Sequence, residues 1–202
     1  MAVTGLILIG FVLGHMLGNL TVFAGAEKIN EYAKFLKGNL PLLWGTRVVV
    51  VGSLILHVWA AVSLTGRAKA ARPVAYGKKV PQASTFASRT MRVGGLLLLA
   101  FIVFHLLHFT AGVIQPAPFS ETDVHANLVQ NFSIPWVALI YLVAMLALGA
   151  HLFHGVWASF RTLGLVKPSG DPFKRRLAVA VAGIVWLGFT LIPSAILAGL
   201  VK

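Results

Sequence analysis

Five long stretches of this chain contain no aspartate, glutamate, lysine or arginine, and they constrain its fold more than any other feature. They cover residues 1–26, 48–66, 93–120, 124–160 and 177–201 of the 202. A helix needs about 20 apolar residues to cross the hydrocarbon core of a bilayer. Each stretch is close to that length or exceeds it. The sequence therefore predicts five membrane-spanning helices, and it excludes an ordinary soluble enzyme, a disordered chain and a fibrous protein.

The expected fold is a single all-α domain over residues 1–202, a five-helix transmembrane bundle. The expected spans are 2–23, 42–65, 91–115, 135–160 and 177–201. Between the first two spans, Glu27–Gly38 has apolar residues at helical spacing, which predicts a short amphipathic helix at the membrane surface. Irregular connections are expected around Pro73 and Pro81, and again from Pro168 to Pro172.

Basic residues are distributed unevenly over the four connections between the spans. Those at 25–47, 67–92 and 161–176 hold four, seven and five lysines and arginines, whereas 116–133 holds none and carries two acidic residues. Because loops rich in lysine and arginine stay in the cytoplasm, we expect the two most basic connections, 67–92 and 161–176, inside and the other two outside. This arrangement puts the N-terminus inside and the C-terminus outside. The net charge of +12 is then explained by topology and anionic lipid, and no nucleic-acid partner is expected.

Six of the seven histidines lie inside the predicted spans, where an ionisable side chain usually marks a functional site. They are His15, His57, His105, His108, His151 and His154, whereas His125 lies in a connection that we expect to face water. At a rise of about 1.5 Å per residue, His15 and His105 lie level in the outer half of the membrane. His57 and His151 lie level in the inner half. The alternative for any one histidine is an imidazole satisfied by a neighbouring helix.

Two histidines at equal depth on facing helices can bind one iron from opposite sides, as the axial ligands of a b-type haem. The chain has no cysteine, which excludes thiolate ligation, iron–sulfur clusters and covalent haem attachment. The sequence thus predicts two b haems stacked across the membrane. Gly10, Gly14 and Gly18 form a small-residue stripe beside His15. Close helix packing is the first interpretation of this stripe, and room for a porphyrin face is the second.

His108 and His154 each follow one of these histidines by three residues, one turn nearer the membrane surface. That position suits a haem propionate or a quinone head group, and it also suits an ordinary polar residue near the interface. Four arginines near the inner ends of the spans are further propionate candidates: Arg67, Arg89, Arg92 and Arg161.

A quinone site is expected at the outer end of the first and third spans, because a quinone carbonyl needs hydrogen-bond donors in an apolar pocket. The donors near that end are Asn19, Tyr32, Lys34, His108 and Gln115. His108 is the strongest candidate among them, and binding of a propionate is its alternative role. A second location, on the inner side near Ser53 and Trp59, stays open.

Four short patterns contain the histidines of the two pairs. They are His-Met-Leu-Gly-Asn at 15–19, Leu-His-Val-Trp at 56–59, Phe-Ile-Val-Phe-His at 101–105 and His-Leu-Phe-His-Gly-Val-Trp at 151–157. Together with five spans in about 200 residues, they resemble the single-chain, di-haem cytochrome b subunit (b558 type) of succinate dehydrogenase and fumarate reductase. The resemblance covers essentially the whole chain and depends on the order of the four histidines.

The resemblance implies that His15 and His105 bind a distal haem near the outside, and that His57 and His151 bind a proximal haem near the cytoplasm. It favours His105 and His151 over the histidines that follow them. It also implies a membrane anchor in the bacterial cytoplasmic membrane, with an FAD flavoprotein and an iron–sulfur protein as partner subunits. Electrons would pass to menaquinone or ubiquinone, and a higher oligomer of the whole complex is compatible with this arrangement.

One departure from the family bears on the direction of the reaction. Some fumarate-reducing members carry a glutamate in the span that holds the second proximal ligand, whereas residues 135–160 here contain no carboxylate. This difference favours succinate oxidation. Two alternatives remain: the cytochrome b subunit of a hydrogenase or formate dehydrogenase, and a transporter or proton channel that uses membrane histidines.

Overall fold

The computed structural model describes residues 1–72, 74, 85–167 and 171–202, and in that part of the chain it contains helices and no strands. Five helical segments are long and apolar enough to cross a membrane, which confirms the predicted number. They are α1 with the 3₁₀ turn η1 (Ala2–Leu20 and Thr21–Ala24), α3 (Leu40–Ala70), α4 with the π-helical turn η2 (Phe86–His105 and Leu106–Thr110), α6 (Pro135–Thr162) and α7 (Pro172–Leu197).

Two short helices lie between the spans. The predicted amphipathic segment is α2 (Ala26–Gly38), and Gly25, with φ of 102°, provides the sharp turn into it. Helix α5 (Val124–Phe132) lies in the connection after the third span, and the side chain of Asp123 caps it by accepting a hydrogen bond from the Ala126 amide at 2.9 Å. The sequence did not predict α5.

Some boundaries differ from the expected spans. The third span was expected to reach Gln115, but α4 ends at His105 and η2 ends at Thr110. Gly112 then adopts φ of 59°, a conformation that an α-helix does not contain. Pro172, expected in an irregular connection, is instead the first residue of α7. The expected irregularity at Pro73, Pro81, Pro168 and Gly170 lies outside the described residues.

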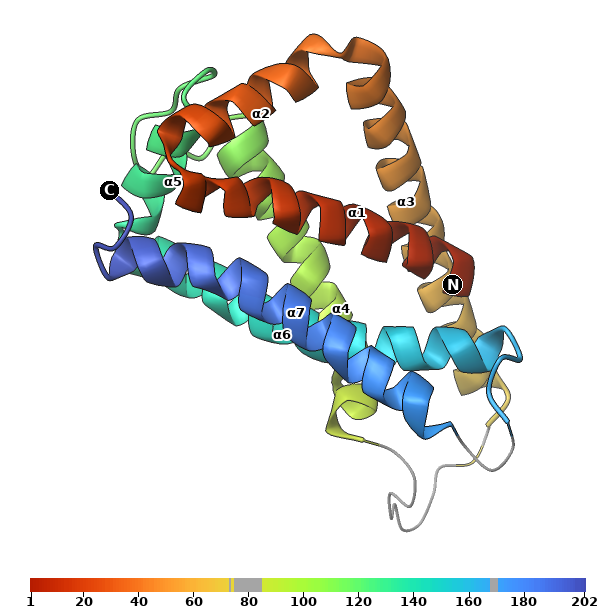
Figure 1. Ribbon diagram of the computed structural model, residues 1–202. Helices are drawn as coiled ribbons and strands as arrows, with labels where there is room; N and C mark the ends of the chain where they lie inside the picture. The colour runs from red at the N-terminus through yellow and green to blue at the C-terminus, as the bar shows by residue number, and fades with distance from the viewer. Residues whose placement is uncertain (73, 75–84, 168–170) are drawn as a thin grey trace.

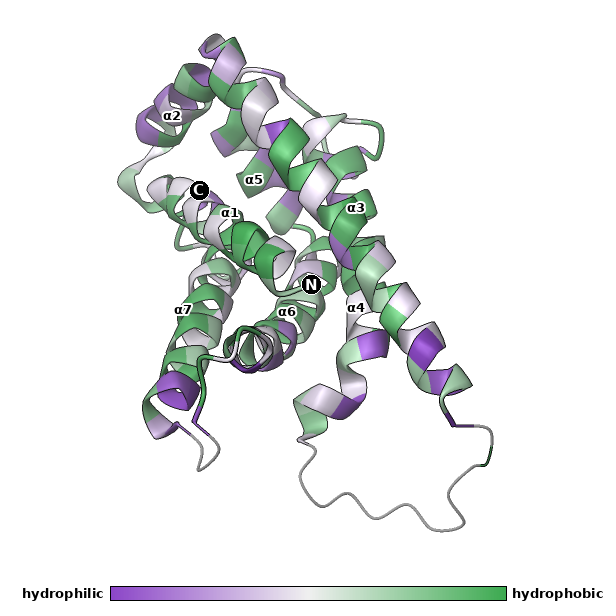
Figure 2. Cartoon of the chain, turned by 90° about the vertical axis from the view of Figure 1, so that its right-hand side faces the viewer, coloured by the Kyte–Doolittle hydropathy of each residue, from purple (hydrophilic) through white to green (hydrophobic). Residues whose placement is uncertain are grey.

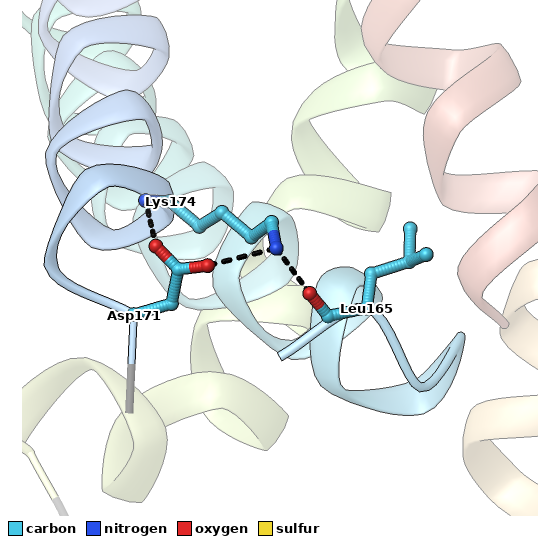
Figure 3. Close-up of polar contacts among 3 residues, drawn as sticks. All are labelled: Leu165, Asp171 and Lys174. Carbon is cyan, nitrogen blue, oxygen red and sulfur yellow. Dashed lines mark hydrogen bonds and ion pairs between the residues drawn. The ribbon is translucent and has the colours of Figure 1, made fainter. Parts of the chain in front are cut away.

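The start of α7 is fixed to the end of α6 by one lysine (Figure 3). Asp171 caps α7 through the Lys174 amide, and Lys174 Nζ lies 2.8 Å from Asp171 Oδ2 and also donates to the Leu165 carbonyl. The hydrogen bond from Lys174 lowers the pKa of Asp171 below its ordinary value. These contacts hold together the two helix ends on either side of the connection.

The long helices pack in pairs, with α6 and α7 running side by side in opposite directions (Figure 1). Helix α4 packs on α6, and α1 crosses α3, α6 and α7. The N-terminus lies at the end of the bundle where α3 and α6 finish, and the C-terminus lies at the other end, near α2 and α5 (Figure 1). The two termini lie at opposite ends because the number of long helices is odd.

Most of the long-helix surface is apolar and exposed. In Figure 2 the hydrophilic residues gather on α2 and at the helix ends, while the lengths of the long helices are largely hydrophobic. Only 6% of the most apolar window of α3 is buried within the chain, against 33% for α6 and for α7. Apolar surface of this extent is not stable in water, and lipid is the solvent that suits it.

Candidate functional site

Two pairs of histidines meet inside the bundle, in the combinations that equal depth predicts. In the pair expected on the cytoplasmic side, called the inner pair, the rings of His57 on α3 and His151 on α6 have centroids 6.3 Å apart at an interplanar angle of 56°. In the pair expected on the other side, called the outer pair, the rings of His15 on α1 and His105 on α4 have centroids 5.9 Å apart at 77°. The structure thus brings all four residues together two by two, although their role as ligands stays a prediction.

Both separations suit an ion bound between two imidazoles. A ring nitrogen binds a transition metal at about 2.0–2.1 Å, so two rings on opposite sides of one ion have centroids roughly 6 Å apart. Direct ring–ring packing also covers this range, and the surroundings of the rings distinguish the two cases. Within the described residues, α1 and α4 have no extended contact, and neither have α3 and α6. The helices of each pair therefore stand apart at the level of their histidines.

Several glycines near these histidines face open space, whereas Gly5 lies against the His57 ring and Gly95 against the His151 ring. A Cβ atom added at Gly10, Gly14, Gly52 or Gly94 would meet no described atom within 4 Å. Gly18 differs, because a Cβ there would lie 2.4 Å from the Tyr32 ring. The stripe on α1 is therefore a packing surface only at Gly18. The open positions leave the room that a flat macrocycle needs, and the residues present fit a haem at each pair.

A hydroxyl group orients His57 in the inner pair. The Thr4 hydroxyl donates to the Met1 carbonyl at 3.0 Å, and its oxygen lies 3.2 Å from His57 Nδ1. Because the single hydroxyl hydrogen is used, the Thr4 oxygen accepts from Nδ1–H, which leaves a lone pair on His57 Nε2. His151 Nδ1 is buried and has no hydrogen-bond partner among the described residues. A buried ring nitrogen without a partner is costly, so a partner from outside the chain fits there.

Aromatic rings and one amide surround the outer pair. Phe11 stacks on His15 with centroids 5.5 Å apart, and Phe101 stacks on His105 at 5.9 Å. The Asn19 side chain donates to the His15 carbonyl at 2.8 Å. The Tyr141 hydroxyl on α6 lies 3.3 Å from His105 Nδ1. Metal-binding histidines usually have such a hydrogen-bond partner at the second ring nitrogen.

His108 lies behind this pair and is almost completely buried, with 1% of its surface exposed. Its Nδ1 lies 2.9 Å from the Tyr141 hydroxyl, and its Nε2 lies 2.9 Å from Asn131 Oδ1 on α5. Both ring nitrogens therefore have partners within the chain. This arrangement favours a positioning role over direct contact with a quinone or a propionate.

The remaining predicted site residues lie at the ends of the bundle. Arg67, Arg89, Arg92 and Arg161 are exposed in the end turns of α3, α4 and α6, and His154 is half-buried one turn beyond His151. At the outer end, Gln115 donates to the Gly112 carbonyl. Tyr32 is exposed on α2 and its ring lies against Gly18, and Lys34 lines a shallow pocket with Phe35 and Pro41. None of these eight residues belongs to either histidine pair.

Sequence reasoning missed three residues of the site: Thr4, Asn131 and Tyr141. Each is a polar residue in or beside a charge-free stretch, and such residues in apolar surroundings need partners. Tyr141 was the most detectable, because it is one of three tyrosines and lies within the stretch from 124 to 160. Among the described residues, no group of three or more histidines and carboxylates could hold a metal ion, so pairs are the relevant unit.

Comparison with known proteins gives one match. The family model described as succinate dehydrogenase/fumarate reductase transmembrane subunit matches residues 67–191. The matched region includes His105, His108, His151 and His154, but not His15 or His57. No curated protein and no solved structure matches the chain significantly. His15 and His57 are therefore assigned to the site by their geometry alone.

Proposed function

The chain belongs to the succinate dehydrogenase/fumarate reductase transmembrane subunit family, and from this premise we propose that it conducts electrons between the partner subunits and a membrane quinone. A member of this family is a multi-pass membrane subunit of an oxidoreductase complex and associates with the other subunits of that complex. The family favours this function over a hydrogenase or formate dehydrogenase subunit, and over a transporter or channel. The proposed partners are an FAD flavoprotein and an iron–sulfur protein.

The observation that carries the proposal is that four histidines form two pairs, with ring centroids 5.9 Å apart in one pair and 6.3 Å apart in the other. His15 and His105 would hold a distal b haem, and His57 and His151 a proximal one. A bound b haem supplies a one-electron carrier inside the apolar bundle. Thr4 and Tyr141 keep a proton on Nδ1 of His57 and His105, so that Nε2 of each is available as a ligand.

Haem stoichiometry tests this proposal directly. The purified complex should contain two b haems per copy of this chain in a pyridine haemochrome assay, and its reduced-minus-oxidised spectrum should resolve two components. One haem or none would contradict the proposed ligand scheme. Two haems without succinate-dependent quinone reduction would leave the scheme intact and would contradict the electron-transfer role in this complex.

The proposed orientation has the N-terminus in the cytoplasm and the C-terminus outside, in a bacterial cytoplasmic membrane. The basic residues at the ends of α3, α4, α6 and α7 support it. They would serve as topology signals, and as contacts for a partner subunit or for propionates, with Arg67, Arg89, Arg92 and Arg161 as candidates. A reporter fused after Lys202 should be active outside the cytoplasm, and one inserted near Gly77 inside. The reverse pattern would contradict this orientation.

Succinate oxidation is the proposed direction, because α6 contains no carboxylate beside His151. Proton transfer through the membrane along α6 would need such a group. Activity in membrane vesicles tests the proposal. Electrons that cross from the inner side to an outer quinone site without a compensating proton move with an inside-negative potential. Succinate oxidation should therefore slow when that potential is collapsed, and insensitivity to the collapse would argue against the proposal.

The proposed quinone site, for menaquinone or ubiquinone, lies at the outer end of α1 and α4. The candidate donors are Asn19, Tyr32, Lys34, His108 and Gln115. Tyr32 and Lys34 are exposed there, whereas both ring nitrogens of His108 have partners, so α2 supplies the donors open to a lipid-soluble ligand. A quinone-site inhibitor should perturb the spectrum of the distal haem. Perturbation of the proximal haem alone would place the site on the inner side, near Ser53 and Trp59.

A further inference from the structure

A chain of buried polar side chains extends away from His105 to the outer cap of the bundle, and the proposed electron path does not use it. The Tyr141 hydroxyl lies 3.3 Å from His105 Nδ1 and 2.9 Å from His108 Nδ1. His108 Nε2 in turn lies 2.9 Å from Asn131 Oδ1. The chain ends where Asn131 Nδ2 donates to the Asn127 carbonyl at 2.9 Å. We call Tyr141, His108 and Asn131 the outer polar chain.

The hydrogen bonds of the outer polar chain have one consistent direction. Since the Asn131 amide nitrogen donates to a carbonyl, its oxygen faces His108 and can only accept. His108 Nε2 therefore carries the proton, and its Nδ1 accepts from the Tyr141 hydroxyl. The Tyr141 oxygen is then left to accept from His105 Nδ1–H. His105 Nε2 is left with a lone pair, which is the state that a metal ligand requires.

The surroundings prevent the outer polar chain from rearranging. Asn131 is 2% and Tyr141 7% exposed, and Tyr141 belongs to an apolar cluster that includes Phe132 and Val137. The Phe109 ring lies 4.1 Å from the His108 ring, centroid to centroid. Reversing any one bond would leave two buried donors or two buried acceptors facing each other, which is costly because neither group would have a partner. The direction set at Asn131 is therefore transmitted to His105.

The backbone also departs from a regular helix at this point. Immediately after His105 the chain forms the π-helical turn η2, with the Ala111 amide bonded to the Leu106 carbonyl. Such turns occur frequently at functional sites. Here the turn contains His108, and it allows His105 and His108 to share one hydroxyl on α6.

We propose that Tyr141, His108 and Asn131 are positioning residues that fix the tautomer of His105 and strengthen it as a haem ligand. The inference rests on the proposed function, in which His105 binds the distal haem. A hydrogen bond accepted from Nδ1–H makes the imidazole a more basic ligand, which stabilises the oxidised iron. The outer polar chain thus keeps the reduction potential of the distal haem lower than it would otherwise be.

Tyr141→Phe tests the proposal, since it removes the hydroxyl and keeps the ring in the core. In the whole complex we expect two b haems, a more positive midpoint potential for the distal haem and an unchanged potential for the proximal haem. Retention of the distal haem should weaken, by about 10-fold or more when a hydrogen-bonding partner of a ligand is lost. Thr190→Val removes a hydroxyl that donates only to the backbone of its own helix, and it should change neither potential.

Two variants of His108 separate positioning from mere filling of space. A glutamine can donate to Asn131 through its amide nitrogen and accept from Tyr141 through its oxygen, so His108→Gln should retain the normal distal potential. His108→Leu has a similar volume but no polar atoms, and it should shift that potential in the same direction as Tyr141→Phe. The double variant of His108→Leu and Tyr141→Phe should shift it no further than Tyr141→Phe alone.

The outcomes distinguish this inference from the function on which it rests. If His105→Ala retains both haems, the proposed ligand scheme is wrong. If His105→Ala loses the distal haem while Tyr141→Phe leaves its potential unchanged, only the role of the outer polar chain is overturned. Equal shifts in His108→Gln and His108→Leu would also overturn it. Thr4→Val removes the corresponding hydroxyl at the inner pair, so only the reduction potential of the proximal haem should rise.

Discussion

The two histidine pairs have the same spacing but very different support. In the outer pair, His105 contacts a tyrosine that belongs to a buried hydrogen-bonded chain and borders a large apolar cluster. In the inner pair, His57 Nδ1 lies 3.2 Å from the hydroxyl of Thr4, in the first turn of α1, and His151 Nδ1 has no hydrogen-bond partner among the described residues. The described residues therefore hold the outer pair through several buried contacts and the inner pair through fewer.

The helices that carry the pairs differ in the same way. Helix α3, with His57, packs mainly against α1, and its apolar window is only 6% buried, whereas 33% of the α6 window is buried. A helix with few contacts opens easily and gains the most from a bound ligand. We conclude that the outer half of the bundle is preorganised by its own side chains. We expect the inner half to gain order from a group bound between His57 and His151, and from a partner subunit.

Removal of the proposed ligands should have the largest effect and should break the symmetry between the two pairs. His15→Ala or His105→Ala should each eliminate the same one of the two haems, and His57→Ala or His151→Ala the other. Only the second pair of variants should also raise hydrogen exchange along α3, because that helix packs mainly against α1 alone. His125→Ala is the control, since that histidine lies in neither pair, and it should keep both haems.

Loss of the same spectral component from His15→Ala and His57→Ala would contradict the pairing. Equal increases in hydrogen exchange along α3 and α4, whichever haem is lost, would contradict the difference in preorganisation.

A smaller effect on stability and haem affinity is expected when one methyl group is added to α1, either where it faces open space or where it meets another side chain. Gly18→Ala would put a Cβ atom against the far end of the exposed Tyr32 side chain. Because this ring can shift, we expect a loss of about 1 kcal/mol or less in stability. Gly14→Ala meets no described atom, so the haem-free chain should be as stable as the wild type. If a haem occupies that space, its affinity should fall about 10-fold or more, since 1.4 kcal/mol is tenfold.

Haem titration and thermal unfolding of both glycine variants, with and without haem, separate these effects. Normal haem affinity in Gly14→Ala would show that the open face of α1 does not border the distal haem.

The histidine pairs could be predicted because depth along a helix is a linear function of residue number. The helical spacing of apolar residues predicted α2, and the charge-free stretches predicted the five spans. Tyr141 and Thr4 could not be assigned as partners, because they lie 36 and 53 residues from the histidines they contact. Their contacts depend on how the helices rotate and cross, which composition does not encode. The turn η2 and helix α5 were missed for a similar reason, since tertiary hydrogen bonds stabilise them.

The smallest effect is expected at the outer cap, where α2 and α5 meet through Asp123. Its Oδ1 accepts from the Ala126 amide at 2.9 Å and from the Asn30 side chain at 3.0 Å. These two bonds lower the pKa of Asp123 below its ordinary value of 3.8. The ionised carboxylate therefore stabilises the cap fully above pH 3.8, and this stabilisation is lost as the pH falls through the lowered pKa.

Two variants of Asp123 test this contact and the preorganisation of the outer half. At pH 7, Asp123→Ala should cost about 0.5–2 kcal/mol, as loss of an N-cap does, measured as faster hydrogen exchange in residues 124–132. Asp123→Asn keeps an oxygen for the cap, so it should exchange nearly as slowly at pH 7 and should lose the dependence on acid. Because Asn131 lies on α5, loosening this helix in Asp123→Ala should also raise the distal haem potential slightly, while the proximal potential stays fixed. A loosened α5 with no change at the distal haem would mean that the outer pair is ordered by α4 and α6 alone, and that the cap contributes nothing to its preorganisation.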